Sequence, residues 1–430
     1  MKTRDKIWPA LIVFVILFTH CDKEPEPEPE PEPPEVFEIV DTVFYNILRE
    51  LGYDKNYDWV IDSLEALEIE NLHINSCNIS SLEGIQNFAN LRVLSCAYNN
   101  LKELDVSHNK KLEEIYCNDN QLIRIKLAGD SALVSLNCEK NKLTTLYIAD
   151  NLLLEYLYCN ENILNSLTVA DTTVPLKYLD CRNNQLVSLN VSNFPYLSDL
   201  LCYSNHMTSI ILANNTALKN LQVGSLELTA LDVSHNTALE YLACMGCSIT
   251  SLDVSNNLDL YYLACSMNSL TSLDVSNNTA LTHLYCTENQ LTGLDLSNNT
   301  ELLNLDCSYN QLTQLDLSNN PGLQYLFCRR NQLASLDVSN MVSLTQLGCE
   351  QNELTSLDVT GNTDLTFLGC SYNQIDRLDL SLNSSLTTLN IEQMPSLTEV
   401  CVWTTPFPPG GVLLRDTGSP NVYFTTECSQ

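Results

Sequence analysis

The sequence predicts a mostly β solenoid of about 15–16 turns, and three observations support that prediction. One pattern, LxxLxCxxNxLxxLDVSxNxx, recurs every 21 residues, as in the unit that begins at Leu281. Its Leu-x-Cys and Leu-x-Val steps alternate, so both halves of a unit are expected to form short strands with one apolar face. The pattern makes fifteen units from Ile69 to Ser385, and a sixteenth begins at Leu386. A fixed period of this length indicates stacked coils that share one core.

Cysteine occupies the same position in most units. We call such a position, shared by successive units, a rung, and we call the series of cysteines the ladder. The steps between ladder cysteines are 21 residues, apart from one step of 22 between Cys159 and Cys181 and one of 42 between Cys202 and Cys244, where Val223 fills the missing position. Val223 and Ile391 occupy the same rung, so we interpret the ladder cysteines as small buried hydrophobes rather than metal ligands or redox groups. The ladder consists of Cys96, Cys117, Cys138, Cys159, Cys181, Cys202, Cys244, Cys265, Cys286, Cys307, Cys328, Cys349 and Cys370.

An asparagine follows each ladder cysteine by three residues in most units. Its amide has donors and acceptors that can satisfy backbone groups in a tight turn and on the next coil. Cys247 stands on this rung, so the phase of the repeat explains the Cys244-x-x-Cys247 spacing better than a redox pair does. The rung is held by Asn99, Asn120, Asn141, Asn162, Asn184, Asn205, Asn268, Asn289, Asn310, Asn331, Asn352 and Asn373.

These repeats, which cover residues 69–402, resemble the leucine-rich repeat family. The nested 10+11 halves are similar to the 21-residue bacterial class known as IRREKO. The resemblance implies a right-handed superhelix with a parallel β-sheet on its concave face, and binding rather than catalysis. Neither half contains a helix-forming stretch, so we expect a rod with little curvature. Sixteen turns spaced by about 4.8 Å would make it roughly 75 Å long.

The first 35 residues predict export and a lipid anchor. Residues 1–20 have a basic start and a short apolar run, Ile7 to Phe18, which is typical of a signal peptide. Because Cys21 follows, in a segment that resembles a bacterial lipobox, we expect Cys21 to be lipidated; the alternative is an ordinary signal peptide and a secreted protein. Residues 21–35 alternate Pro and Glu and predict an extended tether. The expected location is the cell surface, on the outer membrane.

Residues 36–68 predict an N-terminal cap with a short helix from Val43 to Leu51. The loop that follows resembles an EF-hand, which implies a calcium site at Asp54, Asn56, Asp58, Asp62 and Glu65. It departs from that pattern at loop position 6, where glycine is expected and Trp59 stands. A bulky residue with positive φ is costly, so the alternative is a former calcium site that is kept as a cap.

Residues 403–430 predict a C-terminal cap that covers the last open edge of the solenoid. Cys401 and Cys428 lie outside the ladder, and export predicts an oxidising compartment. We therefore predict a disulfide between Cys401 and Cys428.

An acidic column marks the second half of eight units. Neighbouring carboxylates at this spacing repel one another. We expect local hydroxyls, such as that of Ser234, and turn amides to satisfy them; the alternative is that cations sit between them. The column contains Asp232, Asp253, Asp274, Asp295, Asp316, Asp337, Asp358 and Asp379.

Aromatic residues beside the ladder point away from the core and form the predicted binding face. Exposed aromatic residues suit contacts with proteins and stacking on sugars, although Tyr is also common in strands. The repeat is irregular at Val223, Leu226 and Cys247, so the best patch is expected in residues 197–280, beside Gly224 and Gly246. The predicted partner-binding residues are Tyr156, Tyr178, Tyr203, Tyr241, Met245, Tyr262, Met267, Tyr285, Tyr325 and Phe327.

Composition and motifs exclude several classes of function. The net charge of −32 argues against nucleic acid and against docking on an anionic membrane. Motifs for nucleophilic, metal-dependent or nucleotide chemistry are not found, so an enzyme is not expected. No cofactor is expected apart from calcium in the N-terminal cap. The sequence favours a surface lipoprotein that binds an extracellular protein, as in adhesion; the alternatives are a polysaccharide-binding protein and a non-catalytic envelope spacer.

Overall fold

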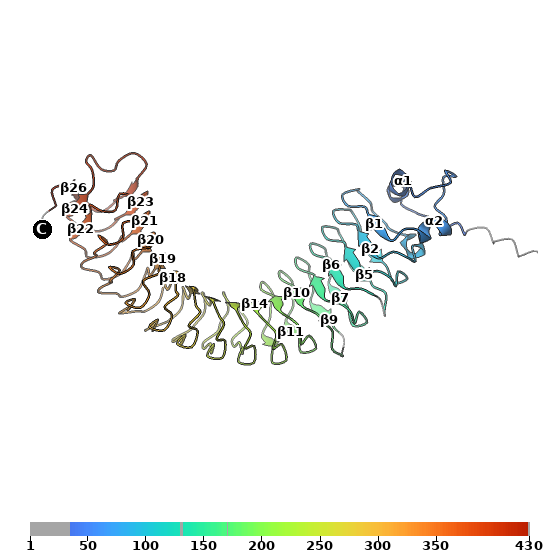
Figure 1. Ribbon diagram of the computed structural model, residues 1–430, viewed down its shortest axis with the longest axis horizontal. Coiled ribbons are helices and arrows are strands. Elements are labelled where there is room, and N and C mark those ends of the chain that lie inside the picture. The colour runs from blue at the N-terminus through green and yellow to red at the C-terminus, as the bar shows by residue number, and fades with distance from the viewer. Residues whose placement is uncertain (1–34, 130–131, 170, 429–430) are drawn as a thin grey trace, which may run out of the picture.

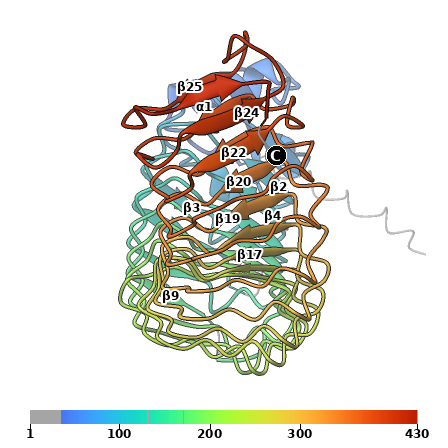
Figure 2. The ribbon, with the colours of Figure 1, turned by 90° about the vertical axis from the view of Figure 1, so that its left-hand side faces the viewer.

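The computed structural model describes residues 35–129, 132–169 and 171–428. Two helices, α1 (Thr42–Glu50) and α2 (Ser63–Leu67), precede a long series of coils that forms an arc (Figure 1). Seen from the C-terminal end, the coils lie one behind another in file (Figure 2). The predicted signal peptide, the lipidation site Cys21 and nearly all of the tether lie outside the described residues. Among the described helices, none is long and apolar enough to cross a membrane.

One 17-stranded parallel sheet follows the inner side of the arc, with one strand from each coil (Figure 1). This concave sheet confirms the predicted β solenoid. Successive strands pair in equivalent register, as where Leu200 lies opposite Leu221. The strands are β1 (Asn71–His73), β2 (Val93–Ser95), β4 (Glu114–Tyr116), β6 (Ser135–Asn137), β8 (Tyr156–Tyr158), β10 (Tyr178–Asp180), β12 (Asp199–Leu201), β14 (Asn220–Gln222), β15 (Tyr241–Ala243), β16 (Tyr262–Ala264), β17 (His283–Tyr285), β18 (Asn304–Asp306), β19 (Tyr325–Phe327), β20 (Gln346–Gly348), β21 (Phe367–Gly369), β23 (Thr388–Asn390) and β25 (Leu413–Arg415).

A second set of short strands lies on the outer side of the arc and does not form a continuous sheet. We call these the convex strands. They pair as β3 with β5, β7 with β9, and β11 with β13, and then as β22, β24 and β26. Their bounds are β3 (Glu103–Asp105), β5 (Arg124–Lys126), β7 (Thr145–Tyr147), β9 (Ser166–Thr168), β11 (Ser188–Asn190), β13 (Ser209–Ile211), β22 (Arg377–Leu380), β24 (Glu399–Val402) and β26 (Tyr423–Thr425).

Two expectations about shape and strands are wrong. In residues 212–376, all of which are described, the second half of each coil forms no strand, and the molecule is an arc instead of a nearly straight rod (Figure 1). The physical reason is that hydrogen bonds hold the coils at strand spacing on the concave side. On the convex side the strand ladder is discontinuous, and asparagine side chains such as that of Asn278 bridge the coils instead, so strand spacing is not imposed there and the stack bends.

The ladder cysteines fill the core between these two sides. All thirteen are free, and all are fully buried. Burial raises the pKa of the Cys96 thiol to about 12, and it raises the pKa of Cys138 and Cys265 to the same value. The thiols therefore stay protonated at neutral pH and pack as apolar groups.

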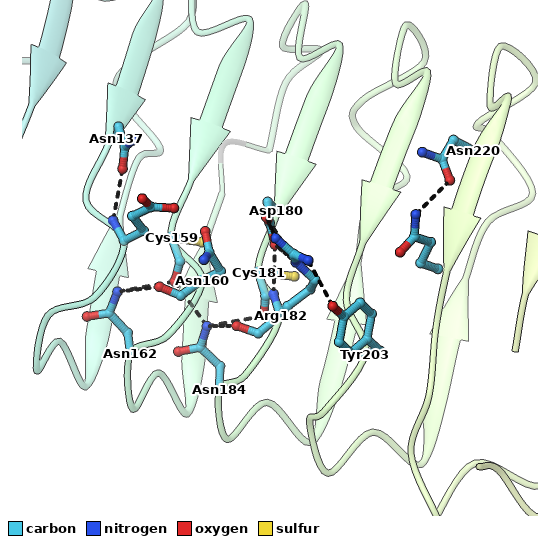
Figure 3. A network of polar contacts seen from close by, with 12 residues as sticks. Asn137, Cys159, Asn160, Asn162, Asp180, Cys181, Arg182, Asn184, Tyr203 and Asn220 are labelled. Atoms are coloured by element: carbon cyan, nitrogen blue, oxygen red, sulfur yellow. Dashed lines mark hydrogen bonds and ion pairs between the residues drawn. The ribbon is translucent and has the colours of Figure 1, made fainter. Parts of the chain in front are cut away.

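The asparagine rung holds each coil to the one before it (Figure 3). The Nδ2 group of Asn162 donates to the carbonyl oxygens of Cys138 at 3.0 Å and Cys159 at 3.2 Å. Its Oδ1 accepts from the backbone N–H of Leu143 at 2.9 Å. The preceding residue, Glu161, has a φ of 52°, so the amide closes a left-handed turn that side chains otherwise disfavour.

Helix α1 covers the first coil with its apolar face. Phe44 and Leu48 are fully buried, and the Phe44 ring lies 6.4 Å from that of Phe88. Asp41 caps the helix by accepting from the backbone N–H groups of Val43 and Phe44. The observed helix begins and ends one residue before the predicted one.

The C-terminal segment continues the solenoid. Strand β25 pairs in parallel with β23, and β26 pairs in parallel with β24, so this segment adds a seventeenth coil. A disulfide joins Cys401 to Cys428, whose Cα atoms lie 5.4 Å apart. The Phe407 ring stacks on Phe424 at 4.8 Å and lies edge-on to Trp403. The open end of the core is thereby covered with aromatic groups.

Candidate partner-binding face

Aromatic rings form a stripe along the concave sheet. The rings of Tyr241 and Tyr262 stack with centroids 4.1 Å apart and planes within 8°. On its other side Tyr262 stacks with His283 at 5.7 Å and contacts Tyr285 at 5.5 Å. Equivalent positions on neighbouring parallel strands lie directly side by side, so the regular period of the sequence places these rings in contact.

A cavity of about 600 Å³ opens beside this stripe. Its lining combines Met245 and Ala243 with the rings of Tyr203, Tyr241 and Tyr262. The structure therefore brings together four of the predicted partner-binding residues. The remaining lining residues are Ser204, Asn205, His206, Gln222, Val223, Gly224, Ser225, Leu226, Glu227 and Gly246.

The cavity lies where the asparagine rung is interrupted. Leu226 and Cys247 stand on two successive rungs. The Leu226 side chain cannot replace the amide hydrogen bonds, and it is turned outward with 74% of its surface exposed. Cys247 replaces part of the network, because its sulfur accepts from the backbone N–H of Ser225 at 3.4 Å. Two rungs of missing amides thus leave the concave surface hollow at this point.

Gly224 forms part of the cavity wall. A Cβ atom at this position would lie 2.8 Å from the Met245 carbonyl oxygen and 3.3 Å from the Tyr203 Cβ. Most coils carry a larger residue here, directly after the cysteine rung. Glycine therefore allows the neighbouring coils to approach closely at the bottom of the cavity.

Arg182 positions the ring of Tyr203 at one end of the stripe (Figure 3). Its guanidinium makes a bidentate pair with Asp180, and Nη1 donates to the Tyr203 hydroxyl at 2.8 Å. The hydrogen bonds to Asp180 raise the pKa of Arg182 above its usual range. Asp180 is buried and the Arg182 side chain is 29% exposed, so this pair is partly shielded from solvent and holds the Tyr203 ring in place.

The other predicted binding residues lie outside the cavity. Met267 does not line it; its side chain is half-exposed in the turn of a later coil. The structure places Tyr156 and Tyr178 in β8 and β10, before the cavity. Tyr285 is in β17, and Tyr325 and Phe327 are in β19, after the cavity.

Sequence reasoning missed several polar residues of this face. Arg182 and Arg329 both directly follow a ladder cysteine, which is the position of Tyr203 and Met245, so their phase in the repeat could have identified them. His206 and Glu227 contact one another at 3.3 Å at the cavity rim. The positions of His206 and Glu227 within their turns do not match those of the predicted binding residues, so the repeat could not have identified them.

The EF-hand-like loop has the left-handed backbone at position 6 that its sequence pattern requires. Its carboxylates, however, accept hydrogen bonds from backbone N–H groups of the same segment. Trp59 at position 6 has a φ of 70°, in the region that usually requires glycine. Glu65 accepts from the backbone N–H of Lys55 at 2.7 Å, and Asp62 caps α2. Asp58 bonds to the backbone N–H of Val60.

A side-chain cation occupies this loop. Arg49 of α1 pairs with Asp54 at 3.2 Å, and its guanidinium lies 3.6 Å from the centroid of the Trp59 ring. Within the described residues, the loop carboxylates do not converge as a group of metal ligands. In this arrangement Asn56 bonds to Asp58 and Oδ1 of Asp54 is buried without a hydrogen-bond partner, so calcium binding by this loop stays a prediction.

The acidic column on the convex side is satisfied locally. Asp232 Oδ1 accepts from the backbone N–H of Ser234 at 2.9 Å and from its hydroxyl at 2.6 Å. Hydrogen bonds from serine lower the pKa of Asp232, and they do the same for Asp253 and Asp274. These contacts are the Asp-x-Ser turns that the sequence predicts.

Comparisons with solved structures identify the fold. The chain is 30% identical to the functional domain of InlJ from Listeria monocytogenes, described as including a cysteine ladder; the match covers 80% of this chain and 70% of that chain, with a TM-score of 0.65. YopM from Yersinia enterocolitica is 22% identical over 89% of this chain and 99% of its own, with a TM-score of 0.59.

A leucine-rich repeat protein of Leptospira interrogans is 20% identical over 79% of this chain and 91% of its own, with a TM-score of 0.61. No family model and no curated protein matches the sequence. The chain belongs to the leucine-rich repeat proteins.

Proposed function

We propose that this chain is a surface scaffold that binds a protein partner on its concave face. The observation that supports this most is the cavity between Tyr203, Tyr241 and Met245, because the otherwise regular concave surface is hollow there. A concave apolar site with a few polar groups at its rim is the usual form of a binding site. Tyrosine and methionine are also well suited to protein contacts.

The stacking of the rings favours a protein over a polysaccharide. A sugar ring binds by lying on an exposed aromatic face. One face of Tyr262 is covered by Tyr241 and the other by His283, so this ring presents mainly its edge to solvent. The Phe327 ring is covered by the guanidinium of Arg329 at 4.7 Å. Edges and hydroxyl groups suit the mixed polar and apolar contacts of a protein surface.

We further propose that the protein is anchored at the bacterial outer surface through Cys21 and acts in adhesion. The support is the order of the sequence: an apolar run, a cysteine, and an acidic Pro-rich segment in residues 21–35. An extended tether of this length would reach roughly 40 Å and would hold the arc away from the membrane. Palmitate labelling of cells that express the chain tests the anchor, because Cys21→Ser should abolish the label.

An array of extracellular proteins and glycans, probed with the purified chain, tests the function. Saturable binding to a protein is expected, and Tyr241→Ala with Tyr262→Ala should weaken it at least about tenfold, as for hot-spot residues. Tyr196→Ala is the matched control, because Tyr196 is 60% exposed and does not line the cavity. Thermal unfolding of each variant separates lost binding from lost folding. Binding to glycans alone, or to nothing on the array, would overturn the proposal in favour of glycan capture or an envelope spacer.

A further inference from the structure

A second cluster on the concave face is built around Arg329 and Glu350. Their Nε and Oε2 atoms lie 2.9 Å apart, and the guanidinium lies 4.7 Å from the centroid of the Phe327 ring and 5.8 Å from that of Phe367. An arginine between two rings and a carboxylate has few alternative rotamers, so its orientation is fixed before any partner binds.

Two glycines make room for this pair. A Cβ on Gly348 would lie 2.5 Å from Phe327 Cδ1 and 2.7 Å from Arg329 Nε. A Cβ on Gly369 would overlap Glu350 Oε1. Both side chains therefore lie across the strand of the following coil, in space that other residues would fill. The side chain of Glu350 is only 15% exposed, whereas that of Arg329 is 38% exposed and reaches the concave surface.

Arg182 occupies the same repeat position, and there all three guanidinium nitrogens have a hydrogen-bond partner. Asp180 and the Tyr203 hydroxyl bond to its Nε, Nη1 and Nη2 atoms. For Arg329, among the described residues, the charged contact is Nε with Glu350, which is an ion pair without hydrogen-bond geometry. Its two terminal nitrogens thus remain as donors, in a fork that matches a carboxylate.

We propose that Arg329 binds a carboxylate of the protein that fills the cavity, so that the partner is held at two points. This inference rests on the proposed function. Tyr262 in β16 and Phe327 in β19 are three strand steps apart, which is roughly 14 Å at the usual strand spacing. An extended segment covers that distance in about four residues. The expected recognition element is an apolar side chain followed or preceded, about four residues away, by an acidic group.

Selection from a library of random twelve-residue peptides, displayed on phage, tests the two-point contact on the purified chain. The binders should share an apolar residue and an acidic residue at the expected separation. Each is then synthesised with Glu or Asp replaced by its amide, and with a free or an amidated C-terminus. Loss of binding on side-chain replacement assigns the carboxylate to a side chain, and loss on amidation assigns it to the chain end; both outcomes support the proposal.

Variants of the protein make the assignment specific. Arg329→Ala should weaken these peptides at least about tenfold, as expected for a charge-assisted hydrogen bond, and Arg329→Lys should weaken them less. Glu350→Gln should strengthen them about threefold, because it removes a carboxylate that competes for Arg329. The Arg329→Ala, Glu350→Gln double variant leaves no buried carboxylate unpaired, so it should fold even if Arg329→Ala alone is destabilised. It should bind the peptides as weakly as Arg329→Ala does. Arg330→Ala is the matched control and should change binding less than twofold.

Two results would overturn the inference. The first is a set of peptides that need Tyr262, lack an acidic group and bind equally well to Arg329→Ala. They would contradict the contact with Arg329 but not the proposed function. A selection that yields no binders sensitive to Tyr241 or Tyr262 would contradict both.

Discussion

The coils that carry paired convex strands differ from the central coils, residues 231–359, at one outward-facing position of the convex half. This position recurs in each coil and forms a column. Before residue 212, the opposed outward residues of paired convex strands are Asp105 with Lys126, Tyr147 with Thr168, and Asn190 with Ile211. In residues 231–359 the same column is aspartate throughout, and no convex strand forms in this described stretch.

We infer that side-chain charge is one factor that sets where the convex ladder forms, since pairing also stops between β5 and β7, where Lys126 and Tyr147 are not like charges. Lys126 bonds to Asp105 at 2.5 Å across the first pair. The convex ladder resumes at the C-terminal end, where Asp379 lies opposite Cys401 instead of another aspartate. In the described residues no two aspartates of this column face each other in a ladder. Like charges in register repel, so uniform aspartate favours separated coils and hence curvature.

The largest expected effect concerns the asparagine rung. Asn289 donates to the carbonyl oxygens of Cys265 and Cys286 and accepts from Leu270, in a coil without convex strands. Asn289→Ala should lower the free energy of unfolding by about 3 kcal/mol, because buried backbone groups lose their partners. Asn162→Ala, beside the β7–β9 pair, should cost about 2 kcal/mol, since that pair still holds its coils. Urea unfolding and amide hydrogen exchange measure both.

Cysteine substitutions provide the control for that comparison. The core is the same in both regions, so Cys286→Val and Cys159→Val should each change stability by less than about 1.5 kcal/mol and by similar amounts. Equal losses for the two asparagine variants would mean that the convex ladder contributes nothing to holding the coils.

Charge reversal in the central column should straighten the arc. Replacing Asp274 and Asp316 with Lys places a cation on each side of Asp295, as Lys126 stands beside Asp105. We expect a stabilisation of about 1 kcal/mol, and a larger radius of gyration by small-angle X-ray scattering. Asp274→Asn with Asp316→Asn removes the repulsion but adds no pairing, so it should give a smaller change. Scattering that is the same for all three proteins would refute the electrostatic explanation.

The smallest expected effect is the pH dependence that Asp105 contributes. Burial raises its pKa, but hydrogen bonds from Lys126 and Ser107 outweigh this and hold the pKa at about 2. The folded chain therefore binds the proton less well than the unfolded chain, and the stabilisation is complete above about pH 4 and is lost as the pH falls toward 2. Asp105 is half-exposed, so solvent screening keeps this contribution small.

Melting temperatures at pH 5, 4, 3 and 2 measure that contribution. Asp105→Asn should reduce the dependence slightly. Asp295→Asn should act in the same direction and more weakly, because hydrogen bonds from Ser297 lower the pKa of Asp295 without a lysine partner. A steeper loss for Asp295→Asn would show that the central column is more tightly bound than the structure indicates.

Much of the candidate site could be predicted from the repeat. A strict period places equivalent residues on adjacent strands, so Tyr241 and Tyr262 had to be neighbours once the fold was assigned. The breaks at Leu226 and Cys247 likewise located the cavity. Arg329 and Glu350 could not be found in this way, because their placement depends on glycines in the following coils and on two rings brought together across β19 to β21.

By itself, the sequence determined the stacked coils, the cysteine core and the asparagine rung, because each depends only on the period and on which residues alternate within it. Only the tertiary structure decided the curvature, since that depends on how strongly the convex sides of neighbouring coils attract or repel across space. It also decided that Arg49, contacting Trp59 and Asp54, occupies the N-terminal loop. That arginine comes from a separate helix, and its distance from the loop is set by packing that no local pattern encodes.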